Sequence, residues 1–350
     1  MPILSAAELT DLAVRIFEAA GVPAEDARIV SHSLVGANLR GHDSHGVMRI
    51  PQYVDYLRQG QYRIGVELRI ESETDAIVVC DGQWGLGQVQ SHRLLDLVLP
   101  RARKLGLAAG TARHCGHIGR LGEYAERAAS EGLILIATVN NNGSGHRVAP
   151  PGGYEPRLAT NPLCAGSPVG GDDPVILDFG TSVVAEGKVR SYYLDGRRPV
   201  PEGWLLDPQG RATTDSSVLY EKPLGSILPM GGTQAYKGFG LSLVLDLLAG
   251  GLSGGRCIHP DAPPVRGNNV LFLALDPDKF AGAEHLLAES GTAVRFIRDC
   301  PKTEGVETIT LPGDPERMAL AKRSADGISL LPGHWEKLSA LARELGVAVN

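Results

Sequence analysis

The segment 41–51 gathers groups that transfer protons or bind anions at an unusual density. It holds His42, Asp43, Ser44, His45 and Arg49 between two glycines and a proline. His45 can gain or lose a proton near neutral pH, and Arg49 offers a planar fork that fits a carboxylate. The combination predicts a site for a small acid whose neighbouring carbon changes its proton count. The alternative is a helix C-terminus and a turn, with His42 capping carbonyls and Arg49 on the surface.

A second cluster lies at residues 114–122, where Gly116, Gly119 and Gly122 recur at every third position. Glycines between a strand and a helix let the backbone approach a ligand closely, with helix N–H groups directed at an anion. His117 lies in this loop and Arg120 at the helix start, so we expect the loop to bind a phosphate or carboxylate group. A tight strand-to-helix turn without a ligand is the alternative, because such turns are common.

Three further segments could complete a site. Asp178 closes an apolar strand, where a carboxylate either caps a helix or fixes the tautomer of a catalytic histidine. Lys237 enters an apolar helix at its N-terminal end, which suits anion binding better than a structural role. Residues 311–314 form a Leu-Pro-Gly-Asp turn, which alone is common turn chemistry.

Several familiar motifs are missing from the chain. It has no G-x-G-x-x-G fingerprint, no P-loop and no G-x-S-x-G elbow. The pairs His42/His45 and His114/His117 have a spacing that a metal could use, but neither has an adjacent glutamate ligand. A metal-dependent hydrolase and a non-enzymatic binder of small acids are therefore rival hypotheses; we expect no metal.

Composition narrows the class of protein. The chain has 350 residues, 43% hydrophobic and 21% charged, which is typical of a soluble globular protein of about two domains. A net charge of −6 favours neither nucleic acid nor an anionic membrane as partner. The acidic N-terminal residues exclude a secretory signal, and no apolar run could span a membrane. Five scattered cysteines indicate reduced, buried thiols in a cytoplasmic protein.

The expected elements alternate between helices and strands in the middle of the chain and are helical at both ends. Ser5 and Glu8 form a capping box at the first helix, and apolar periodicity predicts the others. Helices are expected within 5–39 and up to Gly60, and at 88–105, 120–131, 238–252, 316–325 and 334–346; strands are expected at 77–80, 106–112, 133–139, 175–179 and 270–275.

The pattern predicts an α/β (mixed α+β) fold in which a helical layer from both termini accompanies one α/β body. We expect a helical domain formed by residues 1–70 with 305–350. Residues 71–304 would form the α/β domain that binds cofactor and substrate.

The chain as a whole resembles the type-2 malate/L-lactate dehydrogenase family, which includes sulfolactate and ureidoglycolate dehydrogenases. The resemblance rests on 41–51, on 117–120, on Thr-Asn-Pro at 160–162, on 177–182 and on 236–238, in the same order. Segments 37–39, 250–255 and 311–313 are most similar to the hydroxycarboxylate dehydrogenase branch. The resemblance implies a homodimer that binds NAD or NADP without a Rossmann unit, which would explain the missing fingerprint.

The resemblance also implies roles for individual residues. His45 would protonate the carbonyl oxygen with help from Ser44, Arg49 would hold the carboxylate, and Asp178 would orient a histidine. His117 is the acid/base in some members, so two histidines compete for that role. Besides His45 and Asp178, the cofactor would contact Gly119, Arg120, Leu121, Asn141, Ile176, Leu177, Phe179, Gly180, Tyr236, Lys237, Asn268, Leu311, Pro312, Gly313 and Asp314.

The implied activity is NAD(P)-dependent hydride transfer to or from a small 2-oxo or 2-hydroxy carboxylic acid. Reduction of a cyclic imino acid in the same pocket is the alternative. Phe179 and Gly180 replace the Met-Ala of many relatives, and Tyr236 replaces a histidine. The cofactor pocket or substrate mouth is therefore expected to differ from theirs.

Overall fold

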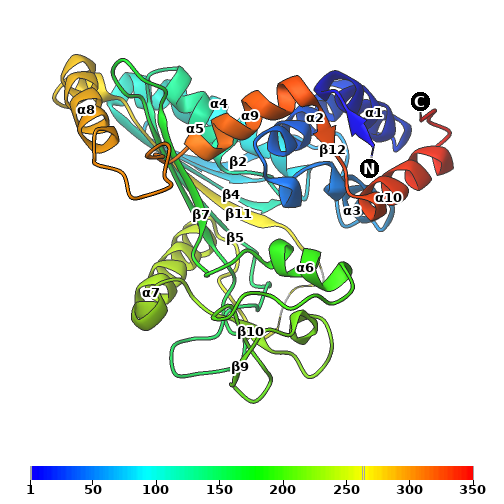
Figure 1. The fold of residues 1–350 in the computed structure, drawn as a ribbon. Helices are drawn as coiled ribbons and strands as arrows, with labels where there is room; N and C mark the ends of the chain where they lie inside the picture. The colour runs from blue at the N-terminus through cyan, green and yellow to red at the C-terminus, as the bar shows by residue number, and fades with distance from the viewer. Residues whose placement is uncertain (1, 262, 264, 350) are drawn as a thin grey trace.

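The computed structural model describes residues 2–261, 263 and 265–349. Its centre is a seven-stranded sheet in the order β2-β3-β4-β11-β5-β6-β7 (Figure 1). Strands β3 and β4 run parallel, and the other neighbouring pairs run antiparallel. This mixed sheet with its covering helices confirms the predicted α/β class. The strands are β2 (Arg69–Glu73), β3 (Ile77–Asp81), β4 (Leu107–Cys115), β5 (Ile134–Asn140), β6 (Pro162–Ser167), β7 (Val175–Gly180) and β11 (Asn268–Leu275).

Two helices, α4 (Gly87–Leu105) and α5 (Gly122–Ser130), lie along one face of this sheet (Figure 1). They bury a continuous apolar core in which Leu94, Tyr124 and Phe272 are fully enclosed. Gly110 lets α4 approach β4, because a Cβ there would lie 2.4 Å from Val98 Cγ2. This packing fixes the ends of β4 and α5, between which the glycine-rich loop 116–121 runs.

Helices from both ends of the chain pack together at one end of the sheet (Figure 1). Strands β1 (Ile3–Leu4) and β12 (Ile328–Ser329) pair antiparallel and tie the two ends to each other. The predicted capping box is confirmed: Glu8 N donates to Ser5 Oγ at 3.2 Å, and Ser5 N donates to Glu8 Oε2 at 2.8 Å. The helices are α1 (Ala6–Ala19), α2 (Ala24–Leu39), α3 (Ile50–Arg58), α9 (Asp314–Asp326) and α10 (Pro332–Glu344).

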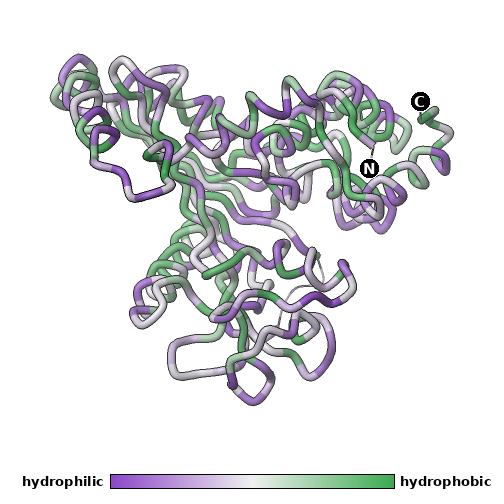
Figure 2. Tube along the Cα trace, in the orientation of Figure 1, coloured by the Kyte–Doolittle hydropathy of each residue, from purple (hydrophilic) through white to green (hydrophobic). Residues whose placement is uncertain are grey.

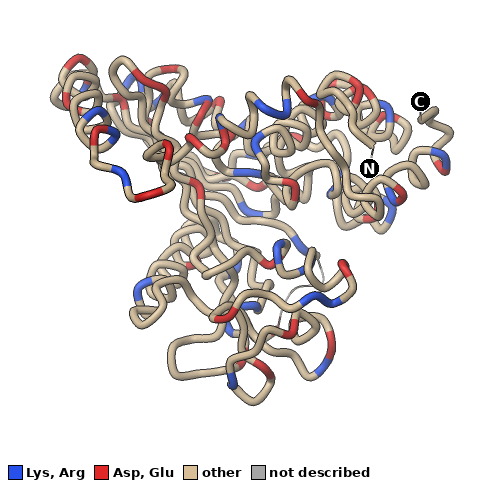
Figure 3. The backbone as a smooth tube through the Cα atoms, viewed as in Figure 1, with Lys and Arg blue, Asp and Glu red and all other residues tan. Residues whose placement is uncertain are grey.

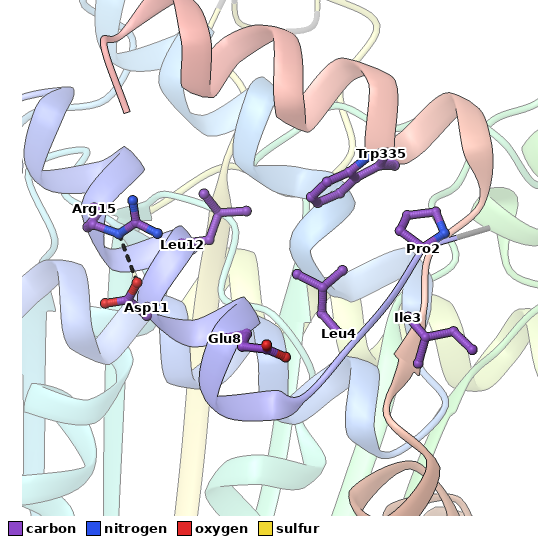
Figure 4. Close-up of a pocket in the computed structure, with 8 residues that line it drawn as sticks. All are labelled: Pro2, Ile3, Leu4, Glu8, Asp11, Leu12, Arg15 and Trp335. Atoms are coloured by element: carbon purple, nitrogen blue, oxygen red, sulfur yellow. Dashed lines mark hydrogen bonds and ion pairs between the residues drawn. The ribbon is translucent and has the colours of Figure 1, made fainter. Parts of the chain in front are cut away.

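A cavity of about 280 Å³ lies beside β1, between α1 and α10 (Figure 4). Trp335 of α10 and Leu4 cover its apolar side, and the ion pair of Arg15 with Asp11 lies at its polar side. Its lining contains none of the residues that the sequence predicts for the site.

The other face of the sheet carries a segment of short strands and two helices (Figure 1). A separate apolar cluster that includes Val189, Leu205 and Ile227 holds it together. The elements are α6 (Glu186–Leu194), β8 (Leu205–Leu206), β9 (Ala212–Thr213), β10 (Ser226–Ile227) and α7 (Ala235–Asp246).

The structure differs from the expected elements in several places. The helix expected at 238–252 is α7, which begins at Ala235 and continues after Asp246 as a π-helical stretch, Leu247–Gly251. Helix α8 (Ala283–Arg298) was not predicted, because Gly291 interrupts its pattern of good helix formers. Gly291 allows α8 to approach the backbone at Gly170, because a Cβ at position 291 would lie 2.4 Å from Gly170 O. Strands β2 and β6 and helix α6 were also not predicted.

The burial predicted for the cysteines holds for Cys80, Cys115 and Cys164. It is wrong for Cys257, which is half-buried, and for Cys300, which is exposed because it follows the surface end of α8.

Across residues 2–261, 263 and 265–349, no helix combines the length and apolar character needed to cross a bilayer. The same residues contain no group of three or more His, Cys, Asp or Glu side chains placed to hold a metal ion.

Candidate active site

The histidine segment is a pair of short 3-10 helices, Asp43–His45 and Val47–Arg49, between α2 and α3. Asn38 at the end of α2 holds it, since its Nδ2 donates to Asp43 Oδ1 at 2.6 Å and its Oδ1 accepts from Val47 N at 2.8 Å. Gly46 is required here, because a Cβ would lie 2.2 Å from Asn38 Oδ1. Arg323 of α9 donates to both Asp43 oxygens, at 2.6 and 3.0 Å. Asp43 therefore anchors the segment.

The rings of His45 and His117 are stacked, although the two residues are far apart in the sequence. Their centroids lie 5.4 Å apart with an interplanar angle of 26°. The Nδ1 of His45 lies 3.0 Å from Ser44 Oγ. Within the described part of the chain, neither ring has a partner at Nε2. Both nitrogens are thus available to a ligand.

His117 sits at the end of β4 on the glycine-rich loop and is held by two tyrosines. Tyr53 OH lies 2.7 Å from its Nδ1, and Tyr62 OH accepts from its backbone N–H at 2.9 Å. Gly119 N donates to the same Nδ1 at 3.3 Å. The His117 ring is therefore fixed from α3 and from its own loop.

Arg49 lies at the start of α3, half-buried, and is partly satisfied within the protein. Its Nε donates to Ser44 O at 2.6 Å, and its Nη1 donates to Gln52 Oε1 at 2.9 Å. Its Nη2 has no partner among the described residues. The guanidinium is thus oriented by two hydrogen bonds and keeps donors free for a carboxylate.

Burial and charge keep both imidazoles neutral. Desolvation, followed by the nearby Arg49 charge, lowers the pKa of His45 to about 3. Burial and then Arg49 lower the pKa of His117 well below its usual range. In the free protein at neutral pH, each ring therefore carries one proton and one lone pair.

These shifts predict how stability depends on pH. Unfolded, both histidines take up protons near pH 6.5. The unfolded state then binds more protons, so the free energy of unfolding falls as the pH drops from about 6.5 toward 3. Each histidine changes the free energy of unfolding by at most about 1.4 kcal/mol per pH unit. Partial access of solvent to the ring reduces this contribution. Urea midpoints from pH 7 to 5 should fall less steeply in a double His45→Asn, His117→Asn variant.

The control for this experiment is His285→Asn, on exposed α8. That variant should keep the wild-type slope of urea midpoint against pH. Equal slopes in the wild type and the double variant would show that the two rings are not buried as neutral imidazoles.

Arg120 follows the glycine loop and is almost fully buried. Its Nη2 donates to Glu126 Oε2 at 2.7 Å, whereas its Nη1 is buried without a hydrogen-bond partner. Gly122 at the start of α5 lies against this group, since a Cβ there would be 2.2 Å from Arg120 Nη1. An unpaired guanidinium nitrogen of this kind fits an anionic group of a ligand.

Asp178 occupies the N-terminus of α5. Its Oδ2 accepts from Gly122 N at 2.7 Å. Burial raises its pKa, although the Gly122 N–H and the Arg120 charge act in the opposite direction. Among the described residues, no histidine lies within hydrogen-bond distance of this carboxylate. In this chain the carboxylate therefore binds the first residue of a helix that lies 56 residues earlier in the sequence.

The remaining predicted cofactor positions fall into two groups. Asn268 joins two loops, because its Oδ1 accepts from Ile118 N at 3.1 Å and its Nδ2 donates to Asn141 Oδ1 at 3.2 Å. Strand β7, which contains residues 176–180, meets the turn 311–314 where Ile176 N donates to Pro312 O at 3.1 Å. These contacts join the loops around residues 118, 141 and 268, and they join β7 to the turn 311–314; Asp178 connects β7 with Gly122 at the end of the glycine-rich loop.

Tyr236 and Lys237 lie apart from this group. They begin α7, both are exposed, and Lys237 Nζ lies 5.9 Å from the centroid of the Tyr236 ring. Within the described ranges, neither contacts the histidine segment of the same chain.

Sequence reasoning missed three contributors to the site. Tyr53, expected only to pack, and Gln88 of α4 form the hydrogen-bond chain behind His117. The position of Tyr53 four residues after Arg49 was a usable signal, since it places both on one helical face. Helix α6 packs on Ser44 through Gly187, where a Cβ would lie 2.9 Å from Ser44 Cβ. That glycine gave no signal of its own.

Comparison with known proteins identifies the family of this chain. The family model for malate/L-lactate dehydrogenase matches residues 4–339. The chain belongs to the malate/L-lactate dehydrogenase family. Hydroxycarboxylate dehydrogenase B from Escherichia coli O157:H7 is 35% identical over 336 residues, covering 95% of this chain and 91% of the relative. The resemblance drawn from the motifs is therefore confirmed, and the chain is an oxidoreductase of this family.

Solved structures of the malate/L-lactate dehydrogenase family share the fold. Malate dehydrogenase from Pyrococcus horikoshii OT3 superposes with a TM-score of 0.88 at 32% identity, over 100% of this chain and 97% of the other. Delta1-piperideine-2-carboxylate reductase from Pseudomonas syringae pvar. tomato superposes with a TM-score of 0.85 at 30% identity, over 98% of this chain and 100% of the other.

Proposed function

We propose that this chain transfers a hydride between a nicotinamide cofactor and C2 of a small 2-oxo or 2-hydroxy carboxylic acid. The observation that carries the proposal is the stacked pair His45 and His117 beside Arg49. Among the described residues, nothing pairs with two imidazole nitrogens and one guanidinium nitrogen there. A 2-oxo acid offers a matching carboxylate and a carbonyl oxygen that must receive a proton.

In this proposal, Arg49 binds the substrate carboxylate, and the bonds to Ser44 O and Gln52 Oε1 hold its guanidinium in place. A carboxylate beside Arg49 offsets the charge that helps to depress the pKa of His45. Substrate binding therefore removes the second cause of that low pKa, after burial. In this proposal His45 takes up a proton from solvent and delivers it to the substrate oxygen as the hydride arrives. Ser44 holds the ring through its Nδ1.

The cofactor is NAD or NADP, and the described residues fit one. The buried, unpaired Arg120 Nη1 suits an anionic group such as a phosphate. Strand β7 joins this region through Asp178, which accepts from Gly122 N, and it meets the turn 311–314 at Ile176. Asn141 and Asn268 line the adjoining loops. When bound, a nicotinamide ring supplies or accepts the hydride.

A second candidate is the reduction of a cyclic imino acid. The structural likeness to delta1-piperideine-2-carboxylate reductase favours it. Such a substrate carries a carboxylate next to a C=N carbon, so Arg49 would keep its role. His45 would then act on the imine nitrogen.

The test is the loss of NADH or NADPH absorbance with the purified protein and a panel of acids. The panel holds oxaloacetate, pyruvate, phenylpyruvate, 2-oxobutyrate and a cyclic imino acid. Turnover of the 2-oxo acids supports the first candidate, and turnover confined to the imino acid selects the second. No turnover of any acid, together with no binding of NADH or NADPH, would reject both candidate functions.

We further propose that the chain acts as a homodimer through α7. One face of this helix is buried against the protein, through Gly238, Ser242, Leu245 and Asp246. Its opposite face is largely apolar and open, with Tyr236 59%, Leu243 38% and Val244 52% exposed, and Leu247 of the following π-helical stretch, 52% exposed, extends it. Figure 2 colours α7 mainly green, and Figure 3 shows it almost free of charges. Apart from exposed Lys237 at its start, this apolar stripe is uncharged, and it matches a second copy of itself.

The dimer can be tested by substitution on that face. Val244→Asp should convert a particle of twice the 37.1 kDa chain mass into a monomer, because it buries an unpaired carboxylate in the interface. Sedimentation velocity measures this directly. Val306→Asp, on an exposed loop, is the matched control and should leave the mass unchanged. A wild-type monomer, or a Val244→Asp dimer, would refute the interface.

A further inference from the structure

The hydrogen bonds behind His117 determine which of its nitrogens carries the proton. Its Nδ1 receives the backbone N–H of Gly119 at 3.3 Å. A peptide N–H can only donate, and its direction is set by the backbone. This contact favours Nδ1 of His117 as an acceptor, which places the proton of the neutral ring on Nε2.

The same constraint fixes which group donates in each of the hydrogen bonds that link His117 to Tyr53 and Gln88. Tyr53 OH lies 2.7 Å from His117 Nδ1, so the hydroxyl donates to that nitrogen. The Tyr53 oxygen in turn accepts from Gln88 Nε2 at 3.1 Å. Tyr53 is 1% exposed and Gln88 0%, so water does not compete for these bonds. Burial raises the pKa of Tyr53 to about 12, which keeps the hydroxyl proton in place at neutral pH.

We propose that Tyr53 is a positioning residue that holds His117 as a neutral imidazole with its proton on Nε2, facing the substrate oxygen. This rests on the proposed function for the identity of that oxygen. His117 then donates a hydrogen bond to the carbonyl oxygen and stabilises the negative charge that develops on it. His45, whose Nδ1 faces only a serine hydroxyl, is left as the group that carries the proton.

The opposite tautomer would work against the reaction. With the proton on Nδ1, the Nε2 lone pair would face the substrate oxygen and repel its growing charge. Gly119 N–H would also lose its acceptor in a buried site, and Tyr53 O–H would be left with the more distant His117 carbonyl oxygen at 3.4 Å. The two donors therefore disfavour that tautomer. They give His117 and His45 different roles, whereas the sequence left both as candidates for the same role.

The test is nitrogen NMR of the protein labelled with ¹⁵N-histidine, because protonated and unprotonated imidazole nitrogens have distinct shifts. His117→Asn identifies the signals of His117 by their loss. The wild type should show a protonated Nε2 and an unprotonated Nδ1 at neutral pH. In Tyr53→Phe the two shifts should move toward each other as the tautomers mix.

Tyr56→Phe is the matched control, since Tyr56 lies on the same helix and accepts from Gln52 without touching His117. It should leave both His117 shifts unchanged. In turnover, Tyr53→Phe should lower kcat about 10- to 100-fold with little change in KM, because one donor to the developing charge is misoriented.

A protonated Nδ1 in the wild type would overturn the proposal, whether or not Tyr53→Phe folds. Unchanged His117 shifts in a folded Tyr53→Phe would overturn it too. If the shifts behave as expected while the protein reduces no acid or imine, the assignment of the tautomer stands and the proposed function fails.

Discussion

Replacing His45 by alanine will lower kcat by about 10²- to 10⁴-fold, the usual contribution of a positioned proton donor. The substrate oxygen then loses the group that delivers its proton, while the Arg49 contact with the carboxylate is kept. KM should therefore change much less than kcat. Steady-state kinetics of the variant on the best substrate of the panel measure both constants.

His285→Ala on exposed α8 is the control for this substitution and should leave both constants unchanged. His117→Ala should cost less than His45→Ala, since His117 only donates a hydrogen bond in this account. A His45→Ala enzyme with near-normal turnover would contradict the assignment and transfer the proton-carrying role to His117.

Arg49→Met will raise KM by about 10- to 100-fold, which corresponds to losing a charge-assisted hydrogen bond to the carboxylate. The hydrophobic stem is kept, so the packing around α3 should change little. Because Arg49 acts on binding more than on the reacting carbon, kcat should fall less than KM rises. The titration of initial rate against substrate concentration measures the effect.

Arg58→Met is the matched control for Arg49→Met. Arg49 precedes the first residue of α3, whereas Arg58 is its last residue and pairs with Glu344 of α10 at 3.0 Å. Its loss should leave KM unaltered. An unaltered KM in Arg49→Met would show that the substrate carboxylate is held elsewhere.

Local signals in the sequence predicted much of the fold. The capping box at Ser5, the apolar run 133–139 and the helix at 88–105 all correspond to observed elements, because each is specified by neighbouring residues. Strand β6 lacked such a signal, since it begins at Pro162 and consists of small residues. It is held by pairing with β5 and β7 on both sides. The domain boundaries at residues 70 and 305 stay a prediction.

The candidate site divides in the same way. His45, Ser44 and Arg49 are close in sequence, so their density alone pointed to them. The stack of His45 on His117, the bonds of Tyr53 and Gln88, and the contact of Gly187 with Ser44 depend on tertiary packing. No periodicity or spacing predicts such contacts.

The transfer of label from reduced cofactor deuterated at C4 of the nicotinamide ring tests the central claim most directly. The protein is incubated with labelled NADH or NADPH, in both C4 stereoisomers, and the acids of the panel. The account predicts a product that carries one carbon-bound deuterium at C2, from one of the two stereoisomers. Consumption of the cofactor without label at C2, or binding of the cofactor with no product from any acid, would contradict it.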